Sequence, residues 1–155
     1  WVRLKCNHLV KHENLTGFSD ETIANWKSLD GTKKVFNYQA EGIRFIINSS
    51  GRCLIADEPG LGKTLQAQGF LYFLQDTTLP ALWVCKSKLR LQAVKEFLDW
   101  CGPKFMAQVI GTSKDFILPG LKIYVISMDL LRRMDSEKLT SLGIKTVIAD
   151  EIQHF

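Results

Sequence analysis

Gly60, Gly62, Lys63 and Thr64 form the segment whose residue types and spacing point most directly to chemistry. Glycines let a backbone approach phosphate oxygens closely, and successive N–H groups ahead of a helix present positive potential to an anion. A lysine at this place can reach the terminal phosphates of a nucleotide, and the threonine hydroxyl can bind Mg²⁺. The segment therefore predicts a phosphate-binding loop for a nucleotide and Mg²⁺.

The predicted loop departs from the usual pattern at Asp57, where a glycine is expected five positions before Gly62. The alternative is an ordinary strand-to-helix turn that carries Gly-Lys-Thr by coincidence. The flanking sequence favours the phosphate loop, because the apolar run 53–56 is typical of a strand and residues 63–75 show helical spacing of apolar side chains.

A second chemical pattern is the acidic pair Asp150 and Glu151, which follows the apolar run 145–149. In open α/β sheets the ligand lies beyond the carboxyl ends of the strands, so we expect this pair at the same crevice as the loop. Asp150 is predicted to hold Mg²⁺, directly or through water, and Glu151 to orient and deprotonate an attacking water. The alternative is a solvated pair at a helix start, where acidic side chains are favoured.

The elements that must position these residues alternate along the chain. Short apolar runs predict strands, and the segments between them show helical periodicity. Strands are expected at 53–56, 81–85, 107–110, 123–127 and 146–149, and helices at 36–48, 63–75, 89–100 and 129–139. Strands buried on both faces that alternate with helices predict an α/β fold with a mainly parallel central sheet and helices on both sides.

The composition is that of a folded protein with a substantial core, since 155 residues with 46% hydrophobic and 23% charged side chains exclude a disordered chain. The net charge of +4 is too small to establish a polyanionic partner. No apolar run is long enough to cross a bilayer, so no membrane contact is expected. The four widely spaced cysteines favour a reducing interior over a disulfide framework.

The N-terminal residues 1–35 are interpreted as an accessory segment, with a turn predicted over 28–34. Cys6, His8 and His12 could supply three zinc ligands, but no fourth ligand follows nearby, which favours ordinary packing. The chain also lacks an initiator methionine and stops just after the acidic pair. We therefore expect it to be a fragment of a larger protein.

The loop sequence Asp57-Glu58-Pro59-Gly60-Leu61-Gly62-Lys63-Thr64 resembles the first motif of Swi/Snf-type ATPases of helicase superfamily two, Asp-Glu-Met-Gly-Leu-Gly-Lys-Thr. That family carries Asp at the place of the missing glycine. Upstream, Tyr38-Gln39-Ala40-Glu41-Gly42 is similar to the family's Tyr-Gln-x-x-Gly signature. Asp150-Glu151-Ile152-Gln153 is similar to its Asp-Glu-x-His or Asp-Glu-x-Gln box. Pro59 in place of Met, Lys86 in place of a common Pro, and Gln153 in place of the commoner His are departures from the family pattern.

The resemblance implies a three-layer RecA-like P-loop NTPase lobe over residues 36–155, with ATP and Mg²⁺ as cofactors. It implies an adenine-recognition role for Gln39 beside the phosphate loop. Lys63 and Glu151 are the expected catalytic residues, and Thr64 and Asp150 the expected metal ligands. The expected contacts to the nucleotide are Gln39, Glu58, Pro59, Gly60, Leu61, Gly62, Lys63, Thr64 and Leu65.

Basic and hydroxyl side chains follow two of the predicted strands, where the resembled family tracks a DNA backbone. Such side chains suit phosphates and carry no sequence information. The expected nucleic-acid contacts are Lys86, Ser87, Lys88, Arg90 and Ser127. A solvated helix start is the alternative for the first four, and it is favoured for Arg132 and Arg133.

The function implied by the resemblance is ATP-driven movement along double-stranded DNA, without sequence specificity, by the first of two lobes. The second lobe, with its arginine finger, is expected outside this chain. One alternative is a strand-separating DNA or RNA helicase of the same superfamily. Another is a binding module without catalysis, against which the intact Lys63, Thr64, Asp150 and Glu151 argue. An intracellular location is expected: the nucleus in a eukaryote, or the cytoplasm and nucleoid in a bacterial or viral host.

Overall fold

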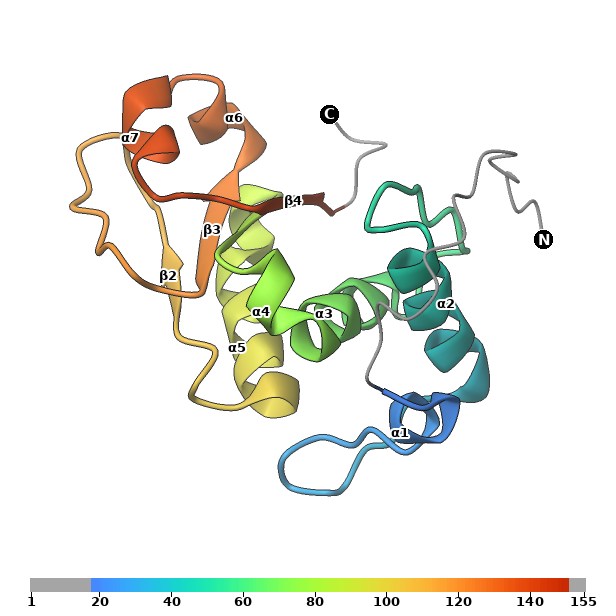
Figure 1. The fold of residues 1–155 in the computed structure, drawn as a ribbon. Coiled ribbons are helices and arrows are strands. Elements are labelled where there is room, and N and C mark those ends of the chain that lie inside the picture. The colour runs from blue at the N-terminus through green and yellow to red at the C-terminus, as the bar shows by residue number, and fades with distance from the viewer. Residues whose placement is uncertain (1–17, 151–155) are drawn as a thin grey trace. The chain divides into compact units, whose positions relative to one another are not determined.

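The computed structural model describes residues 18–150, which are drawn in colour in Figure 1. The chain divides into two compact units, with the boundary between Leu74 and Gln75.

The described part of the first unit, residues 18–74, contains three helices: α1 (Asp20–Ala24), α2 (Asn37–Asn48) and α3 (Lys63–Phe73). Helix α2 buries Ile43, Ile46 and Ile47, which share one face at helical spacing, and it packs against α3. The two helices approach closely at Gly69 of α3, where an added Cβ would lie 2.5 Å from Cδ1 of Ile43. The predicted helix over 36–48 is confirmed.

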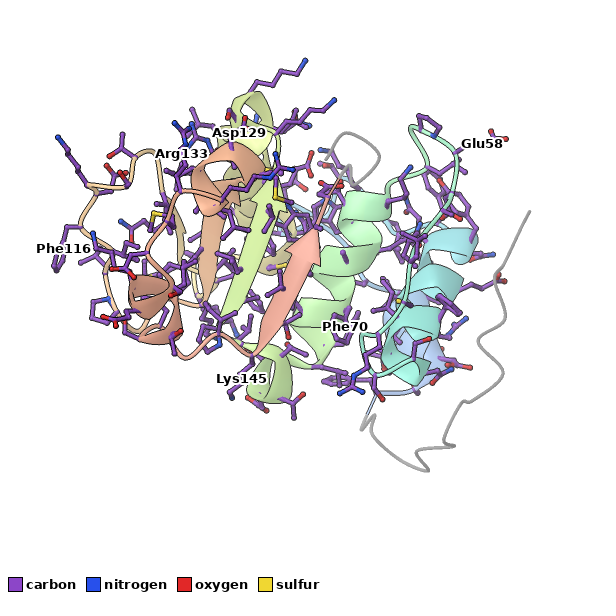
Figure 2. The ribbon with its side chains drawn as sticks, turned by 90° about the horizontal axis from the view of Figure 1, so that it is seen from above. Glu58, Phe70, Phe116, Asp129, Arg133 and Lys145 are labelled. Atoms are coloured by element: carbon purple, nitrogen blue, oxygen red, sulfur yellow. The ribbon has the colours of Figure 1, made fainter. Side chains whose placement is uncertain are left out.

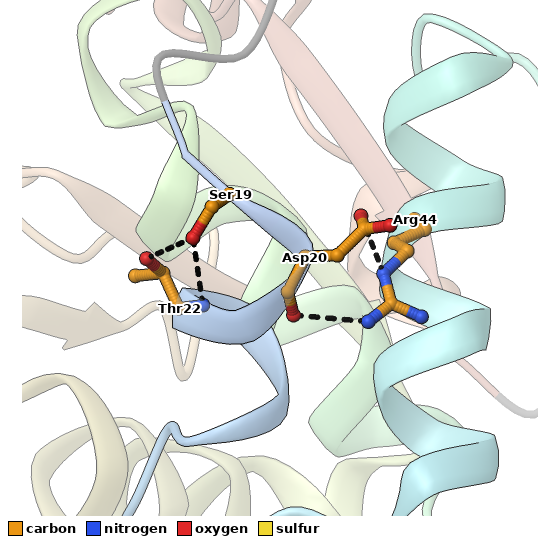
Figure 3. Close-up of polar contacts among 4 residues, drawn as sticks. All are labelled: Ser19, Asp20, Thr22 and Arg44. Carbon is orange, nitrogen blue, oxygen red and sulfur yellow. Dashed lines mark hydrogen bonds and ion pairs between the residues drawn. The ribbon is translucent and has the colours of Figure 1, made fainter.

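A short polar network joins α1 to α2 (Figure 3). Ser19 caps α1 by accepting a hydrogen bond from the backbone N–H of Thr22 at 3.2 Å. Arg44 of α2 forms an ion pair with Asp20, with 2.8 Å between Nε and Oδ1, and it also donates to the Asp20 carbonyl at 2.9 Å. The exposed carboxylate of Asp20 makes this pair a modest contribution to stability.

The predicted turn over 28–34 is confirmed, and Asp30 organises it. Its carboxylate accepts hydrogen bonds from Ser28 Oγ at 2.6 Å and from the Thr32 N–H at 3.0 Å. These bonds, the one from Ser28 first, lower the pKa of Asp30 to about 2. An antiparallel bridge between Lys27 and Lys34 closes the turn.

The second unit is built on a four-stranded sheet in which every pairing is parallel. Its strands are β1 (Ala81–Cys85), β2 (Ala107–Val109), β3 (Ile123–Ser127) and β4 (Thr146–Ala149). Their order across the sheet is β2-β3-β1-β4. The four corresponding predicted strands and the parallel sheet are confirmed, and the α/β fold class with them.

Side chains alternate along β1 and β3, and both strands are buried along their whole length, so apolar side chains lie on both faces of the sheet. Helices cover both of these faces. Leu82 and Tyr124 point into a core that includes Leu130 of helix α6 (Met128–Leu131). On the opposite face Trp83 packs edge-to-face on Phe97 of helix α5 (Arg90–Cys101), with 5.2 Å between ring centroids. The second unit therefore has three layers.

The strand predicted over 53–56 is wrong. These residues carry no strand, although their side chains alternate between half-buried and exposed. A strand exists only where a neighbouring strand pairs with it, and the described part of the first unit holds no strand.

The helix predicted over 129–139 is also wrong as a single element. It is divided into α6 and α7 (Ser136–Thr140), with a turn between them. Asp135 begins α7 by accepting a hydrogen bond from the Glu137 N–H at 2.9 Å. A local cap of this kind competes with continuation of the preceding helix. The helix predicted over 63–75 likewise ends at Phe73, before the short helix α4 (Gln75–Thr78).

Among residues 18–150, no helix combines the length and the apolar character required to cross a bilayer.

Tyr124 offers a test of the second unit's core. Its hydroxyl donates to the Leu118 carbonyl at 2.8 Å and accepts from the Leu121 N–H at 3.3 Å, which fastens the segment before β3. Tyr124→Phe is expected to lower the free energy of unfolding by about 1 kcal/mol, the usual net value of such a bond. Urea denaturation measures this change, and Tyr38→Phe, at a half-buried tyrosine of α2, is the matched control. Equal stabilities of the two variants would contradict the prediction.

Candidate functional site

The predicted phosphate loop is an exposed turn that leads directly into α3. Gly62 is the residue before the helix and has a φ of +73°, and Gly60 has a φ of +86°. Both values lie in the left-handed region that glycine adopts without strain. At Gly62 there is also no room for a side chain, because a Cβ would overlap Nε2 of Gln39. The sequence pattern of two glycines is thus explained by backbone geometry at both places and by space at one.

Gln39 lies against the end of this loop. Its Oε1 accepts from the Phe36 N–H at 3.0 Å, at the start of α2, and its Nε2 donates to the Leu61 carbonyl at 3.3 Å. The side chain is 6% exposed. The structure therefore brings together Gln39, Leu61 and Gly62, although Gln39 is distant from the other two in the sequence. The adenine contact predicted for Gln39 remains a prediction.

The ammonium group of Lys63 points back across the loop. Its Nζ donates to the carbonyl of Asp57 at 2.8 Å and to that of Glu58 at 3.1 Å. This position places a positive charge inside the turn, close to the backbone that the pattern assigns to phosphates. The loop itself therefore holds the ammonium in position.

The remaining predicted loop residues differ in exposure. Glu58, Pro59 and Gly60 are exposed, and Figure 2 shows Glu58 on the loop, with its side chain directed away from the helices. Thr64 and Leu65, in the first turn of α3, are half-buried.

Gln66 is a residue of this region that the sequence patterns did not reveal. It lies in the first turns of α3, is 1% exposed, and donates from Nε2 to Oδ2 of Asp57 at 2.9 Å. Asp57 is the residue that stands in place of the usual first glycine. A buried glutamine has no periodic signature, and the only hint in the sequence is an amide placed three residues after Lys63.

In the second unit, Asp150 lies at the carboxyl edge of the sheet. Its N–H donates to the Val84 carbonyl at 2.8 Å, which continues the ladder between β4 and β1 by one residue. Burial, and then the negative charge of Asp150, raise the pKa of the neighbouring Cys85 thiol to about 11. Asp150 thus occupies the strand-end position predicted for it. Its convergence with Thr64 stays a prediction, because the two residues belong to different units.

Lys86, Ser87 and Lys88 follow β1 at the same edge. Ser87 and Lys88 are exposed, and Lys86 is half-buried. Lys86 precedes the short helix η1 (Ser87–Leu89), and Ser87 and Lys88 are its first two residues. Their side chains are therefore available at the carboxyl ends of the strands.

The other two predicted nucleic-acid contacts have structural roles of their own. Arg90 donates from Nε to the Ser87 carbonyl at 3.0 Å and from Nη1 to the Ile110 carbonyl at 2.8 Å, which joins the start of α5 to the end of β2. Ser127 is 4% exposed, and its hydroxyl caps α6 by accepting from the Leu130 N–H at 3.3 Å.

The loop after β2 reaches this edge as well. Asp115 accepts from Thr112 Oγ1 at 2.5 Å and from the Gly111 N–H at 2.7 Å, and these bonds lower the pKa of its carboxyl group.

Arg132 and Arg133 are exposed in the turn after α6, where Arg133 donates to the Asp129 carbonyl at 3.0 Å (Figure 2).

Several predictions fall on residues outside the described range. Glu151 and Gln153 of the acidic box belong to this group, as do Cys6, His8 and His12.

Within residues 18–150, no three His, Cys, Asp or Glu side chains gather as a metal site. Mg²⁺ at nucleotide sites takes oxygen ligands, one or two from the protein and the rest from phosphates and waters. The Thr64 hydroxyl in the first unit and the Asp150 carboxylate in the second are each ligands of that kind, and their joint role stays a prediction. The positive-φ glycines and the ammonium inside the turn fit a phosphate chain.

Comparisons with known proteins identify the chain's relatives. The family model described as the SNF2-related domain matches residues 38–155. The chain is 34% identical over 117 residues to the human protein named DNA annealing helicase and endonuclease ZRANB3, an alignment that covers 76% of this chain and 10% of that protein. The corresponding bovine protein is 32% identical over 157 residues, which cover 93% of the chain and 14% of the relative.

A second relative comes from Xenopus laevis. It is named SWI/SNF-related matrix-associated actin-dependent regulator of chromatin subfamily A-like protein 1, and it is 36% identical over 121 residues, covering 76% of this chain. The chain spans only 10 to 14% of the length of these three relatives.

The parallel sheet with helices on both faces is consistent with a RecA-like lobe, as the motif resemblance predicts. With the family model matching most of its length, the chain belongs to the SNF2-related family.

Proposed function

We propose that this chain is the ATP-binding lobe of an enzyme that couples ATP hydrolysis to movement along double-stranded DNA. The observation that carries the proposal is the placement of the Lys63 ammonium inside a glycine turn that Gln39 holds from α2. The names of the matched relatives refer to a DNA annealing helicase and to a regulator of chromatin, which supports DNA as the partner. The proposed location is inside the cell.

Each residue of the proposed site has a separate role. Lys63 exchanges its two backbone carbonyls for phosphate oxygens, Thr64 and Asp150 hold Mg²⁺, and Gln39 contacts the base. Mg²⁺, when bound, neutralises charge on the phosphates. Glu151 orients and deprotonates the attacking water. Movement on DNA further requires a second lobe with an arginine finger. We propose that this lobe belongs to a longer protein of which the chain is a part.

The first test concerns nucleotide binding. Lys63→Ala is expected to weaken ATP binding roughly 10- to 100-fold, because a hydrogen bond to a charged group contributes about 1.5–3 kcal/mol. Titration of a fluorescent ATP analogue measures the affinity. Lys33→Ala removes an equal charge from the exposed turn before α2 and is the control. An unchanged affinity in Lys63→Ala would refute the proposed nucleotide site.

The second test concerns the proposed second lobe. Residues 1–155 alone are expected to bind ATP weakly and to hydrolyse it barely, since an arginine finger contributes about 10³–10⁵ in rate at related sites. Phosphate release with and without duplex DNA measures turnover. Robust DNA-stimulated hydrolysis by the isolated chain would contradict this prediction.

The third test concerns the DNA contacts. In the longer protein, the double substitution of Lys86 and Lys88 by Ala is expected to weaken duplex binding and to reduce the salt dependence. The slope of log K against log[salt] should fall by roughly 0.9 for each DNA phosphate that the protein no longer neutralises. The double substitution of Lys95 and Lys104 by Ala, at two exposed lysines of the same unit, removes an equal charge and is the control. A salt slope equal to that of the parent protein would remove these lysines from the DNA interface.

A further inference from the structure

A buried glutamine connects the phosphate loop to the two helices beneath it. Gln66 of α3 is 1% exposed and donates from Nε2 to Oδ2 of Asp57 at 2.9 Å. Its Oε1 is buried without a hydrogen-bond partner among the described residues. A buried amide with one unsatisfied atom carries a free-energy cost, which the hydrogen bond from Nε2 to Asp57 offsets in part.

Asp57 is the point where this contact reaches the loop. Its carboxylate accepts from Gln66, and its backbone carbonyl accepts from Nζ of Lys63 at 2.8 Å. One residue therefore holds both the buried amide and the loop ammonium. A glycine, which the usual phosphate-loop pattern has at this position, lacks the carboxylate and could not make the bond to Gln66.

Helix α2 provides the space that Gln66 occupies. A Cβ built on Gly42 would overlap Oε1 of Gln66 and lie 2.5 Å from its Cδ and 3.2 Å from its Cγ. Gly42 lies within α2, and its backbone is not in the left-handed region, so space rather than φ requires a glycine here. Any larger residue would have to displace the same amide that binds Asp57.

We propose that Gln66 is a positioning residue of the phosphate loop. It anchors the beginning of the loop through the Asp57 carboxylate, and it thereby sets the carbonyl that holds Lys63. Gly42 is the residue of α2 that admits the amide. This inference rests on the proposed function, since the group it positions is the phosphate-binding lysine. The competing explanation is that Gln66 only fills space in the core between α2 and α3.

A stability cycle tests the geometry without any nucleotide. Gly42→Ala is expected to lower the melting temperature by roughly 2–4 °C or more, because the new methyl group displaces the bonded amide. In the Gln66→Ala background the same change should have no cost or should stabilise, since alanine favours a helix over glycine. Additive effects of the two substitutions would overturn the proposed contact between Gly42 and Gln66.

Ligand affinity then separates positioning from packing. Gln66→Ala is expected to weaken ATP binding about tenfold, the effect expected for one hydrogen bond to a charged group, while adenosine, measured as a competitor, binds as before. Asp57→Asn keeps an oxygen that accepts the Gln66 amide and should retain most of the ATP affinity. Gln68→Ala is the matched control, because Gln68 lies on the same helix, is 0% exposed, and its amide atoms have no hydrogen-bond partner among the described residues.

The outcomes distinguish this inference from the function on which it rests. If Lys63→Ala impairs ATP binding but Gln66→Ala does not, or if Gln66→Ala weakens ATP and adenosine equally, the positioning role is overturned and the nucleotide site stands. If Lys63→Ala and the parent chain bind ATP equally, the proposed function fails and the role of Gln66 at that site fails with it.

Discussion

The close packing of α2 against α3 is the constraint on which the loop geometry depends. At Gly69 an added Cβ would press on Ile43, and at Gly42 it would overlap the amide of Gln66. Since neither position carries a side chain, the helices lie near enough for polar groups of both to reach the loop between them. Gln39 extends from α2 and Gln66 from α3. A bulkier residue at either glycine would disturb packing and loop together.

The loop is consequently fastened at both ends and open in the middle. Gln66 bonds to Asp57 at its start, and Gln39 bonds to Leu61 near its end. The residues between, from Glu58 to Gly60, are exposed. The two buried amides thus hold the loop backbone at Asp57 and Leu61 while the residues between stay exposed. A loop whose backbone is already fixed loses less conformational entropy when it binds a ligand.

At the carboxyl edge of the sheet, side chains of similar type have different surroundings. Lys88 is exposed after β1, whereas the guanidinium of Arg90, two residues later, donates to carbonyls of neighbouring segments. Ser87 is exposed, and Ser127 is buried as a helix cap. The sequence shows a cluster of basic and hydroxyl residues but not which of them are engaged internally. Some of their bonding partners come from distant parts of the chain, so only the fold decides that difference.

The sequence by itself determined four strands, the α/β class, and the glycine turn at Gly60 and Gly62 ahead of a helix, because apolar runs and turn glycines act through local chemistry. The structure decided what local patterns do not carry. Residues 53–56 have strand-like composition but no strand pairs with them in the described part of their unit, and the helix expected over 129–139 breaks at the cap of Asp135. The position of Gln66 depends on its hydrogen bond to Asp57, nine residues earlier, and on the space that Gly42 leaves on another helix. Pairing and space between distant segments are properties of tertiary structure, which no single window of sequence contains.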